Sequence, residues 1–220
     1  FGDLQFVGGE KPRQGKSLNE EDMARIEKSI QEAKVQADYV LISIHTHHLV
    51  GDREENVPQF MVDFAHRCID AGANAIIGHG PHLLRPIEVY KDCPIFYSLG
   101  DFILQNENAP FMPEDYYESQ GLTSDATMHE MFAKRSKNFT RGLMTDKRMF
   151  ESVIPRWEGE DGKVVKLELL AIELGFENAR KHGGLPAPAK DSAILERYAQ
   201  LSEPYGVKMI IHGNTAEVIL

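Results

Sequence analysis

Two histidines stand close together in a glycine- and proline-rich stretch at residues 78–82, which reads GHGPH. This stretch follows a short apolar run, so it lies where a strand is expected to end. Its glycines let the backbone turn tightly, and Pro81 stiffens the turn. Neutral imidazole is a common ligand of transition metals. A rigid turn that presents His79 and His82 is therefore a candidate for part of a metal site.

A second group of histidines ends an earlier apolar run, in the sequence VLISIHTHHLV. His45 and His47 are two residues apart, so a continuing strand would direct both side chains to one face and His48 to the other. We therefore predict four metal ligands on two strand-end loops: His45, His47, His79 and His82. A hydrogen-bonded histidine cluster without metal is the structural alternative, and His48 is expected to be packed or solvated.

A catalytic two-metal site also needs carboxylates around ions ~3.5–4 Å apart, which activate water and stabilise the leaving oxygen. Asp101, in the sequence SLGDF directly after an expected strand, is the best-placed carboxylate, and its alternative role is to cap a helix or a turn. We predict His82 and Asp101 as the catalytic residues. Glu88 is expected to pair with Arg85 or to face water, and His66 to be a surface or packing residue.

Other kinds of reactive site have weaker support in the sequence. No nucleophile elbow, phosphate-binding loop or dinucleotide fingerprint is present. Ser43 and Ser98 lie within apolar strands, which disfavours a serine nucleophile. The two cysteines, Cys68 and Cys93, give neither a disulfide framework nor zinc spacing, and Cys68 is expected to be buried and unreactive.

The composition is that of a soluble globular protein, with 42% hydrophobic and 26% charged residues in a chain of 220. Its formal charge of -10 argues against generic nucleic-acid binding, which needs a net basic face. No apolar run approaches the ~18–20 residues that cross a bilayer. There is no signal peptide or initiating Met, so we expect a soluble piece of a longer protein whose membrane anchoring would lie in missing segments.

Helices and strands that would position the histidines alternate along the first hundred residues. Ser17 and Glu20 have capping-box spacing, which predicts a helix from there to about Gln36. The apolar run at 39–45 predicts a strand buried on both faces. A second helix is expected from Pro58 to its glycine stop at Gly72.

Strands are then expected at 74–78, 86–90 and 94–99, the last two as a hairpin. Helix followed by strand, twice in succession, predicts an α/β fold with a parallel sheet. Further strands are expected at 150–157 and 163–174 and in the two short closing runs, KMIIH and AEVIL. One more helix is expected around 194–201.

Residues 101–149 break this alternation and are predicted to be an irregular insertion. Its first part, 105–130, is acidic, and its second part carries six bases, Lys134, Arg135, Lys137, Arg141, Lys147 and Arg148. A basic segment is usually just a solvated face. The alternative is a lid that reverses the negative field locally for an anionic substrate.

Several of these stretches resemble a known family. SIHTHH, then FAHRCIDAGANAIIGHGPHLLRPIEVYKDCPIFYSLGDFI, is similar to the CapA family of capsule and poly-γ-glutamate biosynthesis proteins. ESV, LPAPA and ILERYAQLSEPYGVKM resemble the C-terminal part of that family. The resemblance covers most of the chain except 101–149. In this chain His48 stands where one subgroup has an acid, and Asp101 stands where the family has Asn.

The resemblance implies a calcineurin-like metallophosphoesterase fold, a layered sandwich of β-sheets flanked by helices. Residues 1–220 would be the C-terminal part of one such domain, with its N-terminal half missing. By position, His45, His79 and His82 match family metal-binding blocks. Two divalent ions, Mn, Zn or Fe, are implied, with an incomplete set of ligands because the opening carboxylate and amide blocks are absent.

The function implied by the resemblance is metal-dependent, phosphoesterase-type hydrolysis in capsule or poly-γ-glutamate biosynthesis. The implied partners are an anionic polymer or phosphate-containing substrate and other capsule-synthesis membrane proteins, and the implied location is the extracellular face of the bacterial membrane. The alternative is a non-catalytic surface scaffold that binds or exports the polymer. A family label by itself does not establish the chemistry.

Overall fold

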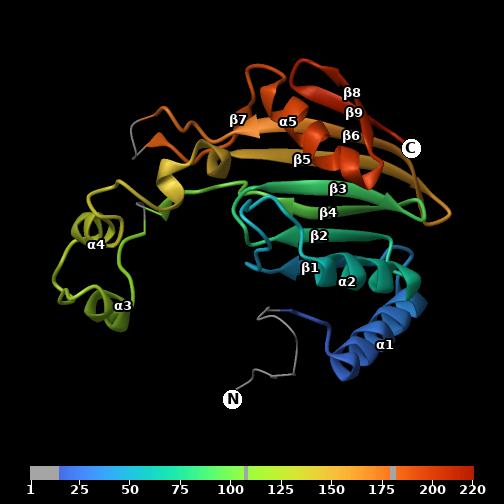
Figure 1. Cartoon of the computed structure of the whole chain (residues 1–220), viewed down its shortest axis with the longest axis horizontal. Helices are drawn as coiled ribbons and strands as arrows, with labels where there is room; N and C mark the ends of the chain where they lie inside the picture. The colour runs from blue at the N-terminus through green and yellow to red at the C-terminus, as the bar shows by residue number, and fades with distance from the viewer. Residues whose placement is uncertain (1–14, 107–108, 179–181) are drawn as a thin grey trace, which may run out of the picture.

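The computed structural model describes residues 15–106, 109–178 and 182–220, which form two β-sheets with helices around them (Figure 1). The first, sheet A, has the strand order β1-β2-β4-β3. Strands β1, β2 and β4 are parallel, and β3 is antiparallel to β4. The strands are β1 (Leu41–His45), β2 (Ala75–His79), β3 (Leu84–Tyr90) and β4 (Cys93–Leu99). The predicted parallel pairing and the β3–β4 hairpin are confirmed.

Two helices, α1 (Glu20–Gln36) and α2 (Gln59–Asp70), cover one face of sheet A. Their apolar side chains pack on Ile76 and Ile95 of the sheet. The predicted helix start at Ser17 is wrong, because Asn19 is the N-cap and its side chain accepts hydrogen bonds from the second and third helical N–H groups. The predicted stop of α2 is confirmed, since Gly72 has the left-handed φ of 117°.

Strand β1 was predicted to be buried on both faces, and this prediction is wrong. It lies at the edge of sheet A, where only β2 pairs with it. Ile42 and Ile44 pack toward the helices, whereas Leu41, Ser43 and His45 are exposed on the opposite face. The burial of a strand depends on what lies over it, and at β1 no described segment covers that second face.

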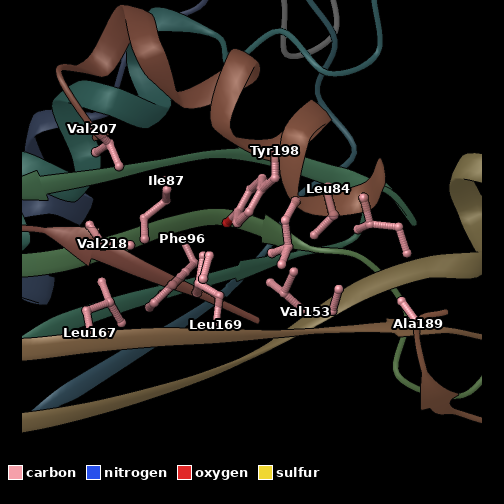
Figure 2. Close-up of a cluster of buried hydrophobic side chains, with 14 of the residues drawn as sticks. Leu84, Ile87, Phe96, Val153, Leu167, Leu169, Ala189, Tyr198, Val207 and Val218 are labelled. Carbon is pink, nitrogen blue, oxygen red and sulfur yellow. The ribbon is translucent and has the colours of Figure 1, made fainter. Parts of the chain in front are cut away.

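Sheet B is antiparallel and packs against the other face of sheet A. Its strands are β5 (Glu151–Glu160), β6 (Lys163–Glu173), β9 (Thr215–Ile219) and β8 (Lys208–His212), with β7 (Ala187–Pro188) paired to β6. Helix α5 (Ala193–Ser202) and the 3-10 turn η5 (Glu203–Tyr205) pack beside β3 and β8. Figure 2 shows this core: Phe96 of sheet A and Leu169 of sheet B lie beneath Tyr198 of α5.

The insertion is more regular than predicted over its described residues. It contains α3 (Glu114–Ser119), α4 (Met128–Arg135), η2 (Leu143–Thr145) and η3 (Lys147–Phe150). A capping box between Thr127 and Glu130 starts α4. Tyr117, Met131 and Phe132 form a small separate core, and Figure 1 shows α3 and α4 standing to one side of the sheets. Residues 107–108 of the predicted insertion lie outside the described part.

These elements confirm a mixed α/β fold with two sheets and flanking helices. The metallophosphoesterase layering and the assignment of 1–220 to one domain stay predictions. Among the described residues, no helix combines the length and apolar character needed to cross a bilayer.

Candidate histidine site

The parallel pairing of β1 and β2 brings the first two predicted ligands together. His45 and His79 are the last residues of their strands and lie opposite each other in the register. Their Nδ1 atoms are 2.9 Å apart, and the rings meet edge to face. Strand ends of a parallel sheet meet at the same edge, which is the usual position of ligand sites in α/β folds.

Two further side chains extend this contact into a chain of hydrogen bonds. His47 Nε2 lies 2.9 Å from His45 Nε2, and Ser43 Oγ lies 2.9 Å from His79 Nε2. Three neutral imidazoles can satisfy all these contacts if each donates through one nitrogen and accepts through the other. The structure therefore brings His45, His47 and His79 together, with Ser43 as an additional member that the sequence did not predict.

The two histidine-bearing segments are held together by a close backbone contact. The Thr46 N–H donates to the carbonyl of His79 at 2.9 Å. Gly80 has a φ of 115°, and a Cβ there would lie 2.7 Å from the Thr46 carbonyl oxygen. Only glycine accommodates both this φ and this approach. The GHGPH stretch is thus a tight turn packed against the residues that follow β1.

His82 pairs with the predicted carboxylate. Its Nδ1 lies 3.1 and 3.0 Å from the two oxygens of Asp101, and both side chains are partly buried. The hydrogen bond to Asp101 raises the pKa of His82, although burial acts in the opposite direction. The His82 ring centroid lies 5.5 Å from that of His47, which links this pair to the other histidines.

His48 was expected to be packed or solvated; it is exposed and contacts Thr46 and Phe60 instead of the other histidines. Its Nδ1 lies 2.7 Å from the Thr46 hydroxyl, and its ring stands edge to face on Phe60.

The pKa of His47 is lowered, first by partial desolvation and then by the neighbouring His45 and His82. Both effects favour a neutral imidazole, the form that can bind a metal ion.

These side chains are of the types that bind divalent transition metals, but their arrangement is not that of a formed metal site. Imidazole and carboxylate are ligands for such ions. Among the described residues, however, no group of three or more His, Cys, Asp or Glu side chains is disposed to hold a metal ion. The nitrogens of His45, His47 and His79 face one another, so a metal ion would have to replace hydrogen bonds between them.

The predicted environment of Glu88 is wrong. It accepts hydrogen bonds from His66 Nε2 at 2.8 Å and from the Tyr97 hydroxyl at 2.5 Å, rather than pairing with Arg85. His66 also stacks on Tyr90, with ring centroids 3.8 Å apart. This network joins α2 to β3 and β4, so it depends on how α2 packs on the sheet.

Two arginines near the site carry contacts that the sequence did not predict. Arg85 is only 1% exposed and donates to backbone carbonyls of the segment after β1. Arg148, from the basic part of the insertion, pairs with Glu54, Glu55 and Asp146. Its charge is therefore paired within the protein.

The predicted burial of Cys68 is confirmed, and that burial raises the pKa of its thiol to about 12.

Comparison with known proteins supports the resemblance to capsule synthesis proteins. Residues 6–106 match the family described as bacterial capsule synthesis protein PGA_cap. The chain is 32% identical over 233 residues to the uncharacterized protein y4sH of Sinorhizobium fredii, a match covering 99% of this chain and 50% of that protein. This chain therefore spans about half the length of that relative.

Two capsule proteins match a shorter part of the chain. The PGA biosynthesis protein CapA of Bacillus subtilis is 45% identical over 75 residues, which is 34% of this chain and 19% of that protein. The capsule biosynthesis protein CapA of Bacillus anthracis is 38% identical over 82 residues, 37% of this chain and 19% of that protein.

Proposed function

Because the chain belongs to the CapA family of capsule and polyglutamate synthesis proteins, we propose that it forms part of a divalent-metal-dependent hydrolase of the phosphoesterase type. One observation carries the proposal: His45 and His79, from two parallel strand ends, approach to 2.9 Å with His47 beside them. Imidazole is a ligand type that divalent transition metals take, and the strand-end edge of an α/β sheet is the usual position of a ligand site.

In this proposal each residue has a defined task. His45, His47 and His79 supply nitrogen ligands, and Asp101 orients His82 through Nδ1, leaving Nε2 as the nitrogen that can serve as a ligand or hold a proton for the leaving oxygen. Bound divalent ions would supply Lewis-acid stabilisation and an activated water. Asp101 favours protonated His82, so the proton-holding role is the one that this pair supports most directly.

The substrate and setting are proposed by analogy with the relatives. An anionic polymer such as poly-γ-glutamate, or a phosphate-containing precursor, would be acted on at the extracellular face of the membrane, alongside other capsule-synthesis proteins. The two-ion site, of Mn, Zn or Fe, would be completed by ligands beyond those in this chain. The complete protein is therefore the form in which activity should be measured.

Metal titration of the wild type and His79→Ala tests this proposal. Calorimetry with Zn²⁺ or Mn²⁺ should show binding that His79→Ala weakens by about tenfold or more. His212→Ala, at an exposed histidine that ends β8, is the matched control and should bind like the wild type. Both the chain and the full-length protein are titrated. Binding by the full-length protein alone would mean that the site needs further ligands, whereas binding by neither would mean that there is no metal site. Absence of metal binding in the full-length protein would contradict the proposal.

The second candidate, a non-catalytic scaffold for the anionic polymer, is favoured by the exposed basic residues at the end of α4. Lys134, Arg135 and Lys137 are exposed there. In a scaffold, neutralising them together should weaken polymer binding and reduce its salt sensitivity, whereas His79→Ala should leave binding intact. In an enzyme, His79→Ala should abolish hydrolysis by the full-length protein without unfolding it.

A further inference from the structure

The segment that carries His47 and His48 has no helix or strand of its own. It runs from residue 46 to 57, between β1 and α2, and we call it the histidine loop. Loops without regular hydrogen bonding need other contacts to take one conformation. The Thr46 N–H bond to His79 fixes only its first residue. The geometry of His47 therefore depends on what holds the rest of the loop.

Arg85 provides two such contacts to the backbone of the loop. It lies on β3, three residues after His82, and its side chain is almost completely buried. Its Nε donates to the Glu54 carbonyl at 3.0 Å, and its Nη2 donates to the His48 carbonyl at 2.8 Å. The planar guanidinium thus joins two points of the loop that lie six residues apart in sequence. Lysine has no equivalent two-point geometry.

Burying a cation such as Arg85 is unfavourable, so its presence at this position needs a reason other than filling space. Burial lowers the pKa of Arg85, and the nearby Glu54 and Glu55 offset only part of that effect. Arginine nevertheless stays charged in proteins. Replacing buried ions by apolar side chains of similar size is often neutral for stability or even stabilising. A fold that needed only a filled space at this position could therefore use an apolar residue.

Arg148 holds the same loop through its acidic side chains. Its Nη1 donates to Glu55 at 2.6 Å and its Nη2 to Glu54 at 3.3 Å, while Asp146 fixes the guanidinium. Arg85 therefore binds the backbone of the loop, and Arg148 binds its carboxylates. Glu54 is the residue that both arginines contact.

We infer that Arg85 is a positioning residue of the histidine site, which holds the histidine loop so that His47 meets His45 and lies beside His82. Its effect on metal binding rests on the function proposed above, whereas its effect on the imidazole contacts does not. Arg85 acts through the loop: within the described part of the chain, its hydrogen bonds go to the Glu54 and His48 carbonyls and not to the side chain of a predicted metal ligand.

The test compares Arg85→Met, Arg85→Lys and the control Arg156→Met, which replaces an exposed arginine on β5. Long-range ¹H–¹⁵N spectra of the metal-free protein report the imidazole nitrogens, with His47→Ala used to assign the His47 signals. In Arg85→Met we expect the His47 signals to move to those of a free imidazole and Zn²⁺ affinity to fall by about tenfold or more. Arg85→Lys should show a smaller change in the same direction, and Arg156→Met none.

Unchanged His47 signals in a folded Arg85→Met variant would overturn the inference. Circular dichroism reports whether that variant folds, and if it does not, unchanged signals in Arg85→Lys would overturn it instead. If Zn²⁺ binds neither the wild type nor the full-length protein, the metal proposal fails. The imidazole signals still decide the positioning role in that case.

Discussion

Tyr198 is a residue whose hydroxyl is buried together with its ring. The side chain is 0% exposed, and among the described residues its hydroxyl has no hydrogen-bond partner (Figure 2). That burial raises the pKa of Tyr198. A buried polar atom without a partner is unfavourable by about 1–3 kcal/mol. The ring itself packs between α5 and both sheets.

We therefore expect Tyr198→Phe to leave the free energy of unfolding unchanged or to raise it by about 1 kcal/mol. Tyr97→Phe is the matched control, because the Tyr97 side chain is also buried but its hydroxyl donates to Glu88 at 2.5 Å. It should lower the free energy of unfolding by about 1–3 kcal/mol. Urea denaturation of both variants measures the contrast. Equal losses in the two would show that Tyr198 has a partner, such as a buried water.

The turn after β2 is an element whose shape depends on one glycine. A side chain at Gly80 would meet both an unfavourable φ and the backbone of Thr46. We expect Gly80→Ala to lower the free energy of unfolding by about 2–4 kcal/mol, since strain of ~1–3 kcal/mol and a steric clash add. It should also separate the His79 turn from the histidine loop.

Gly121→Ala is the control for this change, because Gly121 has a φ of 69° but nothing within 4 Å of an added Cβ. It isolates the backbone strain, which should be about 1 kcal/mol. Differential scanning calorimetry on both variants gives the comparison. If Gly80→Ala is no more destabilising than Gly121→Ala, the close approach to Thr46 contributes nothing.

The ion pairs between η3 and the histidine loop should contribute less to stability at low pH. The hydrogen bond from Arg148 lowers the pKa of Asp146. The pKa of Glu55 is also lowered, because hydrogen bonds, including that from Arg148, outweigh its burial. A carboxylate with a lowered folded-state pKa adds stability above its ordinary pKa of about 4. That stability is lost as the pH falls through the folded-state value.

We therefore expect the difference in unfolding free energy between the wild type and Arg148→Met to be full above about pH 5 and to shrink below about pH 4. Urea denaturation at a series of pH values measures it. Arg141→Met, at an exposed arginine of the same basic segment, should show no such pH dependence. A constant difference across this range would mean that the carboxylates do not depend on Arg148.

At the scale of the whole molecule, the packing of sheet A on sheet B provides the main core. Leu167 of β6 is 0% exposed within it, whereas Val165 of the same strand is 47% exposed. Leu167→Ala should lower the free energy of unfolding by about 2–5 kcal/mol, and Val165→Ala should change it by at most about 0.5 kcal/mol. Chemical denaturation measures both. Similar effects would mean that the sheets are not packed together as described.

Much of this architecture could be predicted from the sequence because its signals are local. Helical periodicity, a glycine stop and a short turn predicted α1, α2 and the β3–β4 hairpin, although the start of α1 was placed two residues too early. The meeting of His45 and His79 follows from a parallel register between adjacent strands. Burial of β1 and the partners of Glu88 could not be predicted, because they depend on which distant segments pack over each strand. The catalytic and metal-binding roles of the histidines stay predictions.

The strand order has a consequence for how the chain folds. The pairs β3–β4, β5–β6 and β8–β9 each join across a turn of two residues, so they can form quickly. The pairing of β1 with β2 must instead close a loop that includes all of α2. Closing longer loops is entropically less favourable, and non-local pairing slows folding. During refolding, the hairpins should therefore be protected from hydrogen exchange first, and the edge that carries the histidines should assemble last.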